Sequence, residues 1–326
     1  MTNPFFARLR FWGLLGAAGF CGAMISLAGF FGALDWRLEI LSHFRIQYSA
    51  AFLLLAAVFA AGRRFRGAAG ALALAALNAA PVLLFLLPPA PASSTSGPPL
   101  RAMLLNVNTS HGNPARVRDA IARETPDLLV LEEISADWLR ELAPVLSAFP
   151  FQHAVPRHDN FGIGLFSRHP FESARVWTFG MAEIPTLFVD IRHDGRRLSV
   201  VATHPMPPAS PELAAERNAQ LDALARELAA MDSPVLLLGD LNVSPWSPVY
   251  RRFLVATGLQ DSARGRSIQP TWPAGFPLLW IPLDHALHSD GLAVLARIIG
   301  PNVGSDHLPL IVDLAWNDTL REPAAP

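Results

Sequence analysis

The sequence GSDHLPLIVDL occupies residues 304–314 and combines two features that decide the fold of the second half of the chain. Residues 308–314 are mostly apolar, as expected for a strand that is buried on both faces. Asp306 and His307 stand directly before that strand, where an acid beside an imidazole is costly to bury without a chemical use. The stretch therefore predicts a buried strand that begins at a functional site.

Other short apolar runs in residues 101–316 follow the same plan, and several of them end in a polar side chain. Two amphipathic stretches, Pro114–Thr125 and Ser210–Met231, have the spacing typical of helices. The alternation predicts an α/β (α+β) fold with one polar site at the rim where the strands end. The strand-like runs are AMLLNVN (102–108), DLLVLEE (127–133), GIGLFS (162–167), TLFVDIR (186–192), LSVVATH (198–204), VLLLGDLN (235–242) and DHALHS (284–289).

Each polar strand end also has a plainer interpretation when it is taken alone. The GDLN of residues 239–242 suits a tight turn, because Asp and Asn hydrogen-bond to their own backbone. Glu132 and Glu133 are as well explained by two solvated acids at a strand end as by a functional site. His204, taken alone, is typical of a hydrogen-bonded core histidine. The ordered combination of these residues favours one shared catalytic site over the separate explanations.

Seven ordered blocks between Leu104 and Leu314 make this half of the chain similar to the endonuclease/exonuclease/phosphatase family. The resemblance is closest to a bacterial branch in which membrane helices precede the domain. It implies a two-sheet β-sandwich flanked by helices, a divalent cation (Mg²⁺ or Mn²⁺) at the rim, and hydrolysis of phosphate esters. A catalytically silent, membrane-tethered binding module is the alternative from another class. The blocks are LLNVN, PDLLVLEE, GIGLFSR, VVATH, GDLN, LDHAL and GSDHLP.

Cleavage of a phosphodiester needs a Lewis acid, an activated water and donors for the charge that develops. The resemblance implies that Glu133 is the principal metal ligand, with Asn106 beside it and Asp306 completing the metal shell. Oxygen ligands of this kind suit Mg²⁺.

The resemblance also implies roles for the remaining polar residues. Asp240 orients or deprotonates the attacking water, and Asn242 holds the phosphate. His204 and His307 donate to the phosphate oxygens or act as acid and base. Asp284 fixes the ring of His307, as orienting carboxylates do in other histidine sites.

Three residues depart from the family pattern. Asn108 stands where Asp is commoner, which weakens a second metal there and leaves Asn108 as a substrate-binding residue. Glu132 replaces Gln, and we expect this extra acid to be a solvated neighbour of the metal ligand. His285 replaces an aromatic residue.

The first hundred residues have a different character from the rest. Only 16% of the whole chain is charged, against about 25% in average soluble proteins. Apolar stretches at about residues 11–34, 46–62 and 68–87 are long enough to cross a bilayer core of about 30 Å. They predict three transmembrane helices in a membrane domain at 1–87, with Asn78 and Pro81 tolerated in the third.

Charge placement predicts the orientation of these helices. Arg8, Arg10 and the Arg63–Arg66 cluster fall on one side of the membrane if there are three crossings, and that side is then cytoplasmic. The domain at 101–316 would lie outside the inner (cell) membrane of a bacterium, after a Pro/Ser-rich linker at 88–100 and before a frayed tail at 317–326. A cleaved signal peptide is the alternative for the first segment, although its 24 uncharged residues exceed the usual core of about 7–15.

Net charge bears on the substrate. Residues 1–100 carry 7 Arg and two acids, a net of +5, whereas residues 101–326 carry 19 Arg and 25 acids, a net of −6. A basic face favours nucleic-acid binding, so the charge counts against a tight nucleic-acid binder without excluding a nonspecific nuclease. The sequence does not decide whether the substrate is a nucleic acid or a lipid headgroup. The expected partner is the lipid bilayer, and no obligate protein partner is inferred. The segment Trp272–Trp280 favours a lipid substrate if it is exposed, but its aromatic residues also suit a core.

Overall fold

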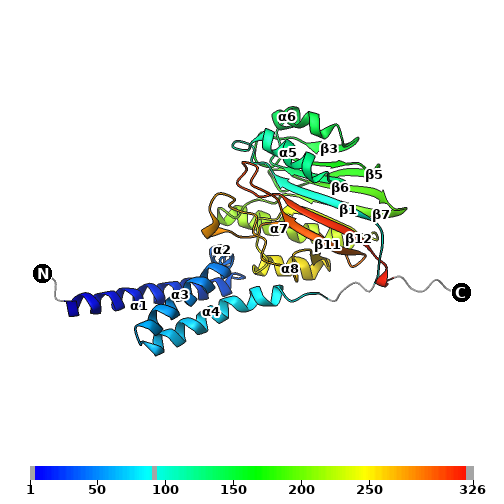
Figure 1. Ribbon diagram of the computed structural model, residues 1–326. Coiled ribbons are helices and arrows are strands. Elements are labelled where there is room, and N and C mark those ends of the chain that lie inside the picture. The colour runs from blue at the N-terminus through cyan, green and yellow to red at the C-terminus, as the bar shows by residue number, and fades with distance from the viewer. Residues whose placement is uncertain (1–3, 90–93, 321–326) are drawn as a thin grey trace. The chain divides into compact units, whose positions relative to one another are not determined.

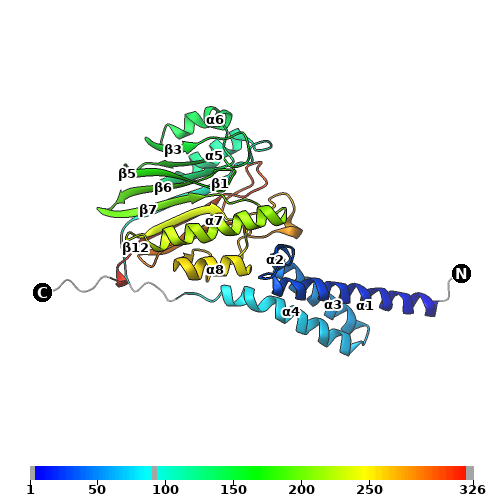
Figure 2. The ribbon, with the colours of Figure 1, turned by 180° about the vertical axis from the view of Figure 1, so that it is seen from behind.

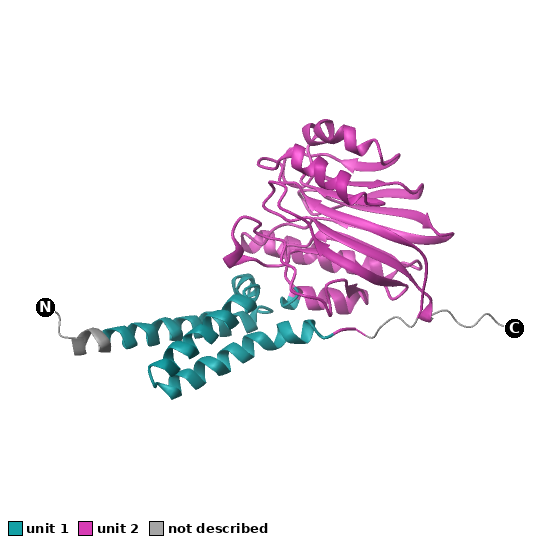
Figure 3. Ribbon diagram, in the orientation of Figure 1, with its two compact units in different colours: residues 1–87, 245–248 teal, residues 88–244, 249–326 magenta. Residues whose placement is uncertain are grey.

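The computed structural model describes residues 4–89 and 94–320, and side chains within 10–89 and 94–319. Two compact units divide the chain (Figure 3). The first comprises residues 1–87 together with Pro245–Pro248, and the second comprises residues 88–244 and 249–326. Helices make up the regular structure of the first unit, whereas the second combines strands and helices (Figure 1).

Two helices of the first unit are long and apolar enough to span a membrane, Arg10–Phe31 and Phe65–Phe85. They correspond to the first and third predicted spans. The second predicted span corresponds to two helices, Trp36–Ser42 and Arg45–Ala61, with a bend of 62° between them. Together they make a third span only if the bent pair is treated as a single membrane-crossing segment. The elements of this unit are α1 (Pro4–Ala28), η1 (Gly29–Phe31), α2 (Trp36–Ser42), α3 (Arg45–Ala61) and α4 (Phe65–Phe85).

Asn78 lies fully buried within α4, where an apolar segment cannot leave an amide unsatisfied. Arg45 Nη1 donates to Asn78 Oδ1 at 2.9 Å and to the Ser26 carbonyl at 3.0 Å, while Asn78 Nδ2 donates to the Leu74 carbonyl at 3.0 Å. These bonds connect α1, α3 and α4 and explain how a polar residue is accommodated in an apolar helix.

The second unit is a sandwich of two six-stranded sheets, which confirms the predicted two-sheet fold flanked by helices. The first sheet has the strand order β11-β12-β1-β2-β4-β3 and the second the order β5-β6-β7-β8-β10-β9. Its strands are β1 (Thr95–Asn106), β2 (Leu128–Glu132), β3 (Phe151–Val155), β4 (Ile163–Ser167), β5 (Phe171–Phe179), β6 (Ile184–His193), β7 (Arg196–Thr203), β8 (Val235–Asp240), β9 (Gln260–Asp261), β10 (Asp284–His288), β11 (Leu292–Ile299) and β12 (Leu310–Asn317).

Helices cover the outer faces of both sheets. On the first sheet, Met103 and Leu105 of β1 pack under α5 (Pro114–Glu124) and α6 (Ala136–Leu146), whereas Leu104 points between the sheets. On the second sheet lie α7 (Pro211–Ala229) and α8 (Pro248–Thr257), which are seen from behind in Figure 2. Because the central strands are covered on both faces, they read as continuous apolar runs.

Two predicted boundaries differ from the structure. Residues 95–100 of the predicted linker belong to β1, where a shift in register between Ser96 and Leu100 accommodates Pro98 and Pro99. The first four residues of the predicted tail are ordered elements: Asn317 is the last residue of β12, and a 3₁₀ turn, η3 (Asp318–Leu320), follows it. Residues 90–93 of the linker and 321–326 of the tail lie outside the described residues.

Candidate functional site

Strand direction brings the polar residues to one end of the sandwich. The parallel pairs β1–β2 and β7–β8 place their carboxyl ends at the same edge of each sheet. The antiparallel strands β10 and β12 begin at that edge, with Asp284 paired opposite Asp240. The residues that the sequence predicts as a single site, from Asn106 to His307, therefore follow or precede strands at this shared edge.

Oxygen-bearing side chains form one half of the site. Asn106 Nδ2 donates to Glu133 Oε1 at 2.9 Å, and Asn108 Nδ2 donates to Asp306 Oδ1 at 2.7 Å. The Asn108 backbone N–H donates to Asn106 Oδ1 at 3.0 Å, which joins the two pairs into one chain of hydrogen bonds. Thr109, which the sequence did not single out, donates through Oγ1 to the Glu133 carbonyl at 2.8 Å.

The backbone at the site is strained at three of the predicted residues. Asn108, Glu133 and Asn242 have φ angles of 55°, 59° and 52°, a left-handed conformation that is uncommon outside glycine. Gly239 is required for a different reason, because a Cβ there would lie 2.0 Å from the Thr203 carbonyl. The strain and the close approach of β7 to β8 suit a site whose geometry the surrounding core holds in place.

The carboxylate oxygens in this half of the site are ligands that suit a hard divalent cation. Burial raises the pKa of Glu133, although hydrogen bonds from Asn106 and the Thr109 N–H oppose that rise, so a nearby cation would favour the carboxylate form. Among the described residues, no cluster of three or more His, Cys, Asp or Glu side chains is arranged so that it could hold a metal ion by itself. One or two carboxylates, as Glu133 and Asp306 would supply, are nevertheless sufficient for Mg²⁺, since it keeps several waters.

Imidazoles and carboxylates form the other half of the site. His307 Nδ1 lies 2.8 Å from Asp284 Oδ2, and His307 Nε2 lies 3.5 Å from Asp240 Oδ2. His204 Nε2 lies 3.6 Å from the same Asp240 oxygen. The Asp240 carboxylate therefore lies within reach of both imidazoles, and all four side chains are buried.

Burial and charge separate the protonation states of these groups. Burial, together with the charge of His307, lowers the pKa of His204 to about 4. Burial opposes a charge on His307 as well, but the carboxylates of Asp284 and Asp240 outweigh it and raise the pKa of His307 to about 10. Burial raises the pKa of Asp240 to about 7 against the opposing charge of His307. At neutral pH one imidazole is thus neutral and the other is a cation.

Glu132 is not the solvated neighbour that we expected. Its side chain is 0% exposed, and its Oε1 and Oε2 both accept from the Asp240 N–H, at 3.2 and 3.1 Å. Burial raises its pKa well above the usual value, and the charges of Asp240 and Asp284 add to the shift. The expectation was wrong because Glu132 is the last residue of β2 and points between the sheets, which the dipeptide alone does not reveal.

We expect Glu132→Gln to stabilise the protein increasingly as the pH rises. Burial holds the pKa of this carboxyl in the folded protein above its unfolded value of about 4.3, so the wild type loses stability as the pH rises from that value towards the folded pKa. An amide has no such loss, and each 1 kcal/mol corresponds to about 2–4 °C in melting temperature for a domain of this size. Thermal unfolding of the detergent-solubilised chain in chelator, at about pH 5 and pH 8, measures the difference. An equal difference at both pH values would contradict a raised pKa of Glu132 in the folded protein.

Two buried side chains that the sequence did not assign to the site hold its loops. Arg217 of α7 is fully buried and donates through Nη1 to the Asn242 carbonyl at 3.1 Å. His285 lies with Nε2 2.8 Å from the Val243 carbonyl and Nδ1 3.5 Å from Asp261 Oδ2. His285 therefore fastens the loop that follows Asp240. Only the position of His285 after Asp284 signalled it in the sequence.

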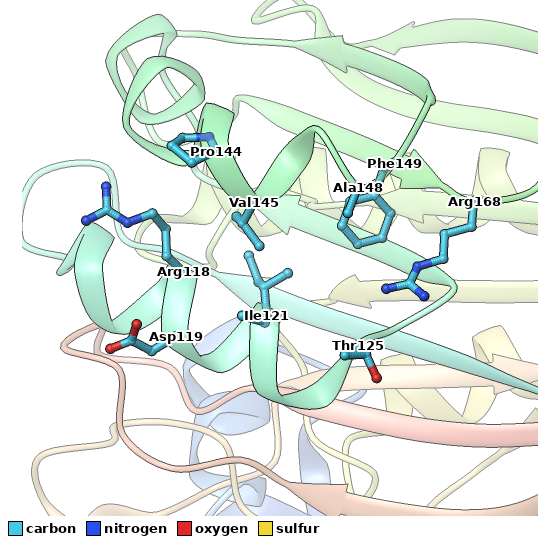
Figure 4. A pocket seen from close by; sticks show the side chains of 10 residues that line it. Arg118, Asp119, Ile121, Thr125, Pro144, Val145, Ala148, Phe149 and Arg168 are labelled. Atoms are coloured by element: carbon cyan, nitrogen blue, oxygen red, sulfur yellow. The ribbon is translucent and has the colours of Figure 1, made fainter.

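A cavity of about 420 Å³ lies apart from these residues, between α5 and α6 (Figure 4). Apolar side chains of Ile121, Val145 and Phe149 line it, with Arg118 and Arg168 at its sides (Figure 4). None of the predicted site residues contributes to its wall. The candidate site is thus defined by converging polar side chains and not by this cavity.

Comparison with known proteins identifies the family. A model of the Endonuclease/Exonuclease/phosphatase family matches residues 103–307, and a search of curated proteins found no match. Three similar solved structures are each less than 25% identical to this chain and support the fold alone. An endonuclease/exonuclease/phosphatase from Beutenbergia cavernae is 23% identical, with 67% of this chain and 72% of that chain covered and a TM-score of 0.58.

The other two structures carry names that refer to different substrates. TDP2 of D. rerio, complexed with a single-strand DNA product, is 16% identical, with 67% of this chain and 99% of that chain covered and a TM-score of 0.55. Sphingomyelinase C from Streptomyces griseocarneus is 21% identical, with 67% and 99% covered and a TM-score of 0.51. Since the family model spans more than half of the chain and these folds agree with it, the chain belongs to the endonuclease/exonuclease/phosphatase family.

Proposed function

We propose that this protein is a membrane-anchored, Mg²⁺- or Mn²⁺-dependent hydrolase of phosphodiester bonds. The observation that carries the proposal is the position of the Asp240 carboxylate, within 3.5 Å of His307 and 3.6 Å of His204, while Asp284 holds the far nitrogen of His307. Paired imidazoles and carboxylates of this kind serve acid–base chemistry. The convergence of two histidines and two carboxylates at one strand edge favours catalysis over a silent binding module.

Each residue has a part in this mechanism. Asp240, with its pKa near 7, accepts a proton from the attacking water. His307, a cation at neutral pH whose ring Asp284 fixes, donates its Nε2 proton to the ester oxygen that leaves as its bond to phosphorus breaks. His204 is neutral and supplies a second donor. Asn242 is proposed as a further donor to the substrate, and Asn108 as a substrate-binding residue whose amide N–H is not essential.

The cation is proposed to bind at Glu133, Asn106 and Asp306. When bound, it supplies a Lewis acid that withdraws charge from a non-bridging phosphate oxygen. Glu133 contributes the charge that attracts it, and the amide of Asn106 holds the carboxylate in place at 2.9 Å.

A panel of phosphate esters tests the proposal. The purified full chain in detergent is assayed against a generic soluble diester, a monoester, plasmid DNA, RNA and phospholipids, with Mg²⁺, with Mn²⁺ and with chelator. We expect hydrolysis of the soluble diester that requires the cation. Full activity in excess chelator, or no hydrolysis of any ester, would reject the mechanism.

The location of the catalytic domain is part of the proposal. With three spans, Arg10 and the Arg63–Arg66 cluster share the cytoplasmic side, and the domain lies outside the cytoplasm. With the two helices that are individually long enough, the domain would stay on the side of the N-terminus. The number of crossings therefore decides the compartment.

A reporter fusion measures that number. Alkaline phosphatase, which is active only outside the cytoplasm, is fused after Pro99 in a bacterial host, and we expect it to be active. A cytoplasmic fluorescent reporter at the same position is the control and should be dark. The reverse pattern would require two or four crossings.

A further inference from the structure

Residues 276–279, which we call the apolar tip, form an exposed apolar surface on the catalytic domain. Phe276 is 50% exposed, Leu278 74% and Leu279 41%. No charged residue occurs from Pro270 to Leu283. Elsewhere in the described part of this domain, no three large exposed apolar side chains fall within four residues of one another. A concentrated apolar patch of this kind marks a protein or membrane contact.

The base of the apolar tip is fastened to the candidate site. Trp272 Nε1 donates to Asp306 Oδ2 at 3.2 Å, and the Ala274 N–H donates to the Asp306 carbonyl at 2.7 Å. Trp272 and Ile281 close the segment through a β-bridge. Thr271 Oγ1 accepts from the Asp284 N–H at 3.1 Å. The apolar tip thus projects from the segment that holds both a proposed metal ligand and the partner of His307.

The chain itself argues for a bilayer as the surface that the tip meets. Residues 86–94 join α4, which is apolar enough to span a membrane, to β1. The ten peptide steps from Phe85 to Thr95 span at most about 35 Å, so if α4 spans a bilayer, the start of β1 is tethered to that bilayer by no more than this length of chain. A partner protein would have to be recruited to the tip, whereas lipid is always present.

We propose that the apolar tip inserts into the interface of the bilayer and places the site at the headgroup phosphates, so that the substrate is a phosphodiester of a membrane lipid. Apolar side chains without neighbouring charges enter this interface favourably. The net charge of −6 on residues 101–326 disfavours the competing polyanion, nucleic acid. The substrate class rests on the proposed function, but the insertion of the tip does not.

Insertion is measured on the full chain in vesicles of phosphatidylethanolamine and phosphatidylglycerol. Cys21 is the free cysteine, and in a Cys21→Ser background Leu278→Cys is labelled with an environment-sensitive fluorophore. Nitroxide-bearing lipid should quench this label. The matched control is Val255→Cys on α8, an apolar side chain that is 86% exposed but isolated, and it should be quenched several-fold less. Equal quenching at the two positions would overturn insertion.

Activity tests the substrate class. The triple substitution Phe276→Ser, Leu278→Ser and Leu279→Ser should lower hydrolysis of vesicle phospholipids by at least about tenfold, because the interfacial contact is lost, while turnover of a soluble diester stays within about twofold. Equal losses on both substrates, or a wild type that cleaves the soluble diester but no lipid, would overturn the lipid assignment. A wild type that cleaves neither would reject the proposed function, and the quenching measurement would still decide insertion.

Discussion

Glu133→Gln should lower phosphodiester hydrolysis by roughly 10²-fold or more, the loss expected when a charge-stabilising group of the transition state is removed. Glutamine keeps the volume and can still hydrogen-bond to Asn106, but it removes the negative charge that attracts the cation. Because the defect lies in cation affinity, activity should recover in part at high Mg²⁺ concentration. Turnover of a soluble diester over a Mg²⁺ titration measures both effects.

Two further substitutions define the metal experiment. Glu141→Gln removes an acid whose side chain is 61% exposed on α6 and should leave the titration unchanged. Asn108→Asp restores the acid that is commoner in the family and should preserve activity or raise metal affinity. A Glu133→Gln protein with wild-type activity at every Mg²⁺ concentration would exclude Glu133 as a ligand. An inactive Asn108→Asp protein would show that the amide has its own role.

His307→Ala and Asp284→Asn should each lower turnover, the histidine by roughly 10²–10⁴, the range for loss of a positioned acid/base or donor. Asp284 acts on the substrate only through the ring of His307, with which it pairs at 2.8 Å. The double substitution should therefore cost far less than the product of the single losses. The turnover of these three proteins and the wild type, on one soluble diester, completes the cycle.

His288→Ala is the matched control for this cycle. His288 is also a buried histidine, at the opposite end of β10 from Asp284, so its loss should leave turnover nearly unchanged. Losses that simply multiply would mean that Asp284 and His307 act independently. Unchanged turnover with weaker substrate binding would show that His307 does not act in catalysis.

The sequence by itself determined the order of the buried strands and the chemistry at their ends. Strands β2 and β8 are buried along their whole length, and the buried parts of β1, β7 and β12 are mostly apolar. The first four end at the rim, whereas β12 begins there. Polar residues at the rim were visible as GDLN, LEE and SDH. Helices α5 and α7 were equally visible from the amphipathic spacing of Pro114–Thr125 and Ser210–Met231. In the structure Asn113 and Ser210 cap them by accepting backbone hydrogen bonds at their first turns.

The sequence did not indicate the more exposed elements. Strand β5 is exposed along most of its length and alternates poorly, and α6 contains Pro144, which argues against a helix when only local pattern is considered. These elements form because the neighbouring strand or sheet offers hydrogen bonds and apolar contacts, and that stabilisation comes from residues distant in the chain.

Tertiary structure alone decided which polar groups are buried and how they pair. Glu132 and Glu133 are adjacent acids, yet Glu132 is enclosed between the sheets against Asp240, 108 positions away. The same holds for Arg217, which is buried against the Asn242 carbonyl, and for the apolar tip, whose exposure no periodicity revealed. Local sequence sets the conformation that a segment prefers, but burial and pKa depend on which distant side chains fill the space around it.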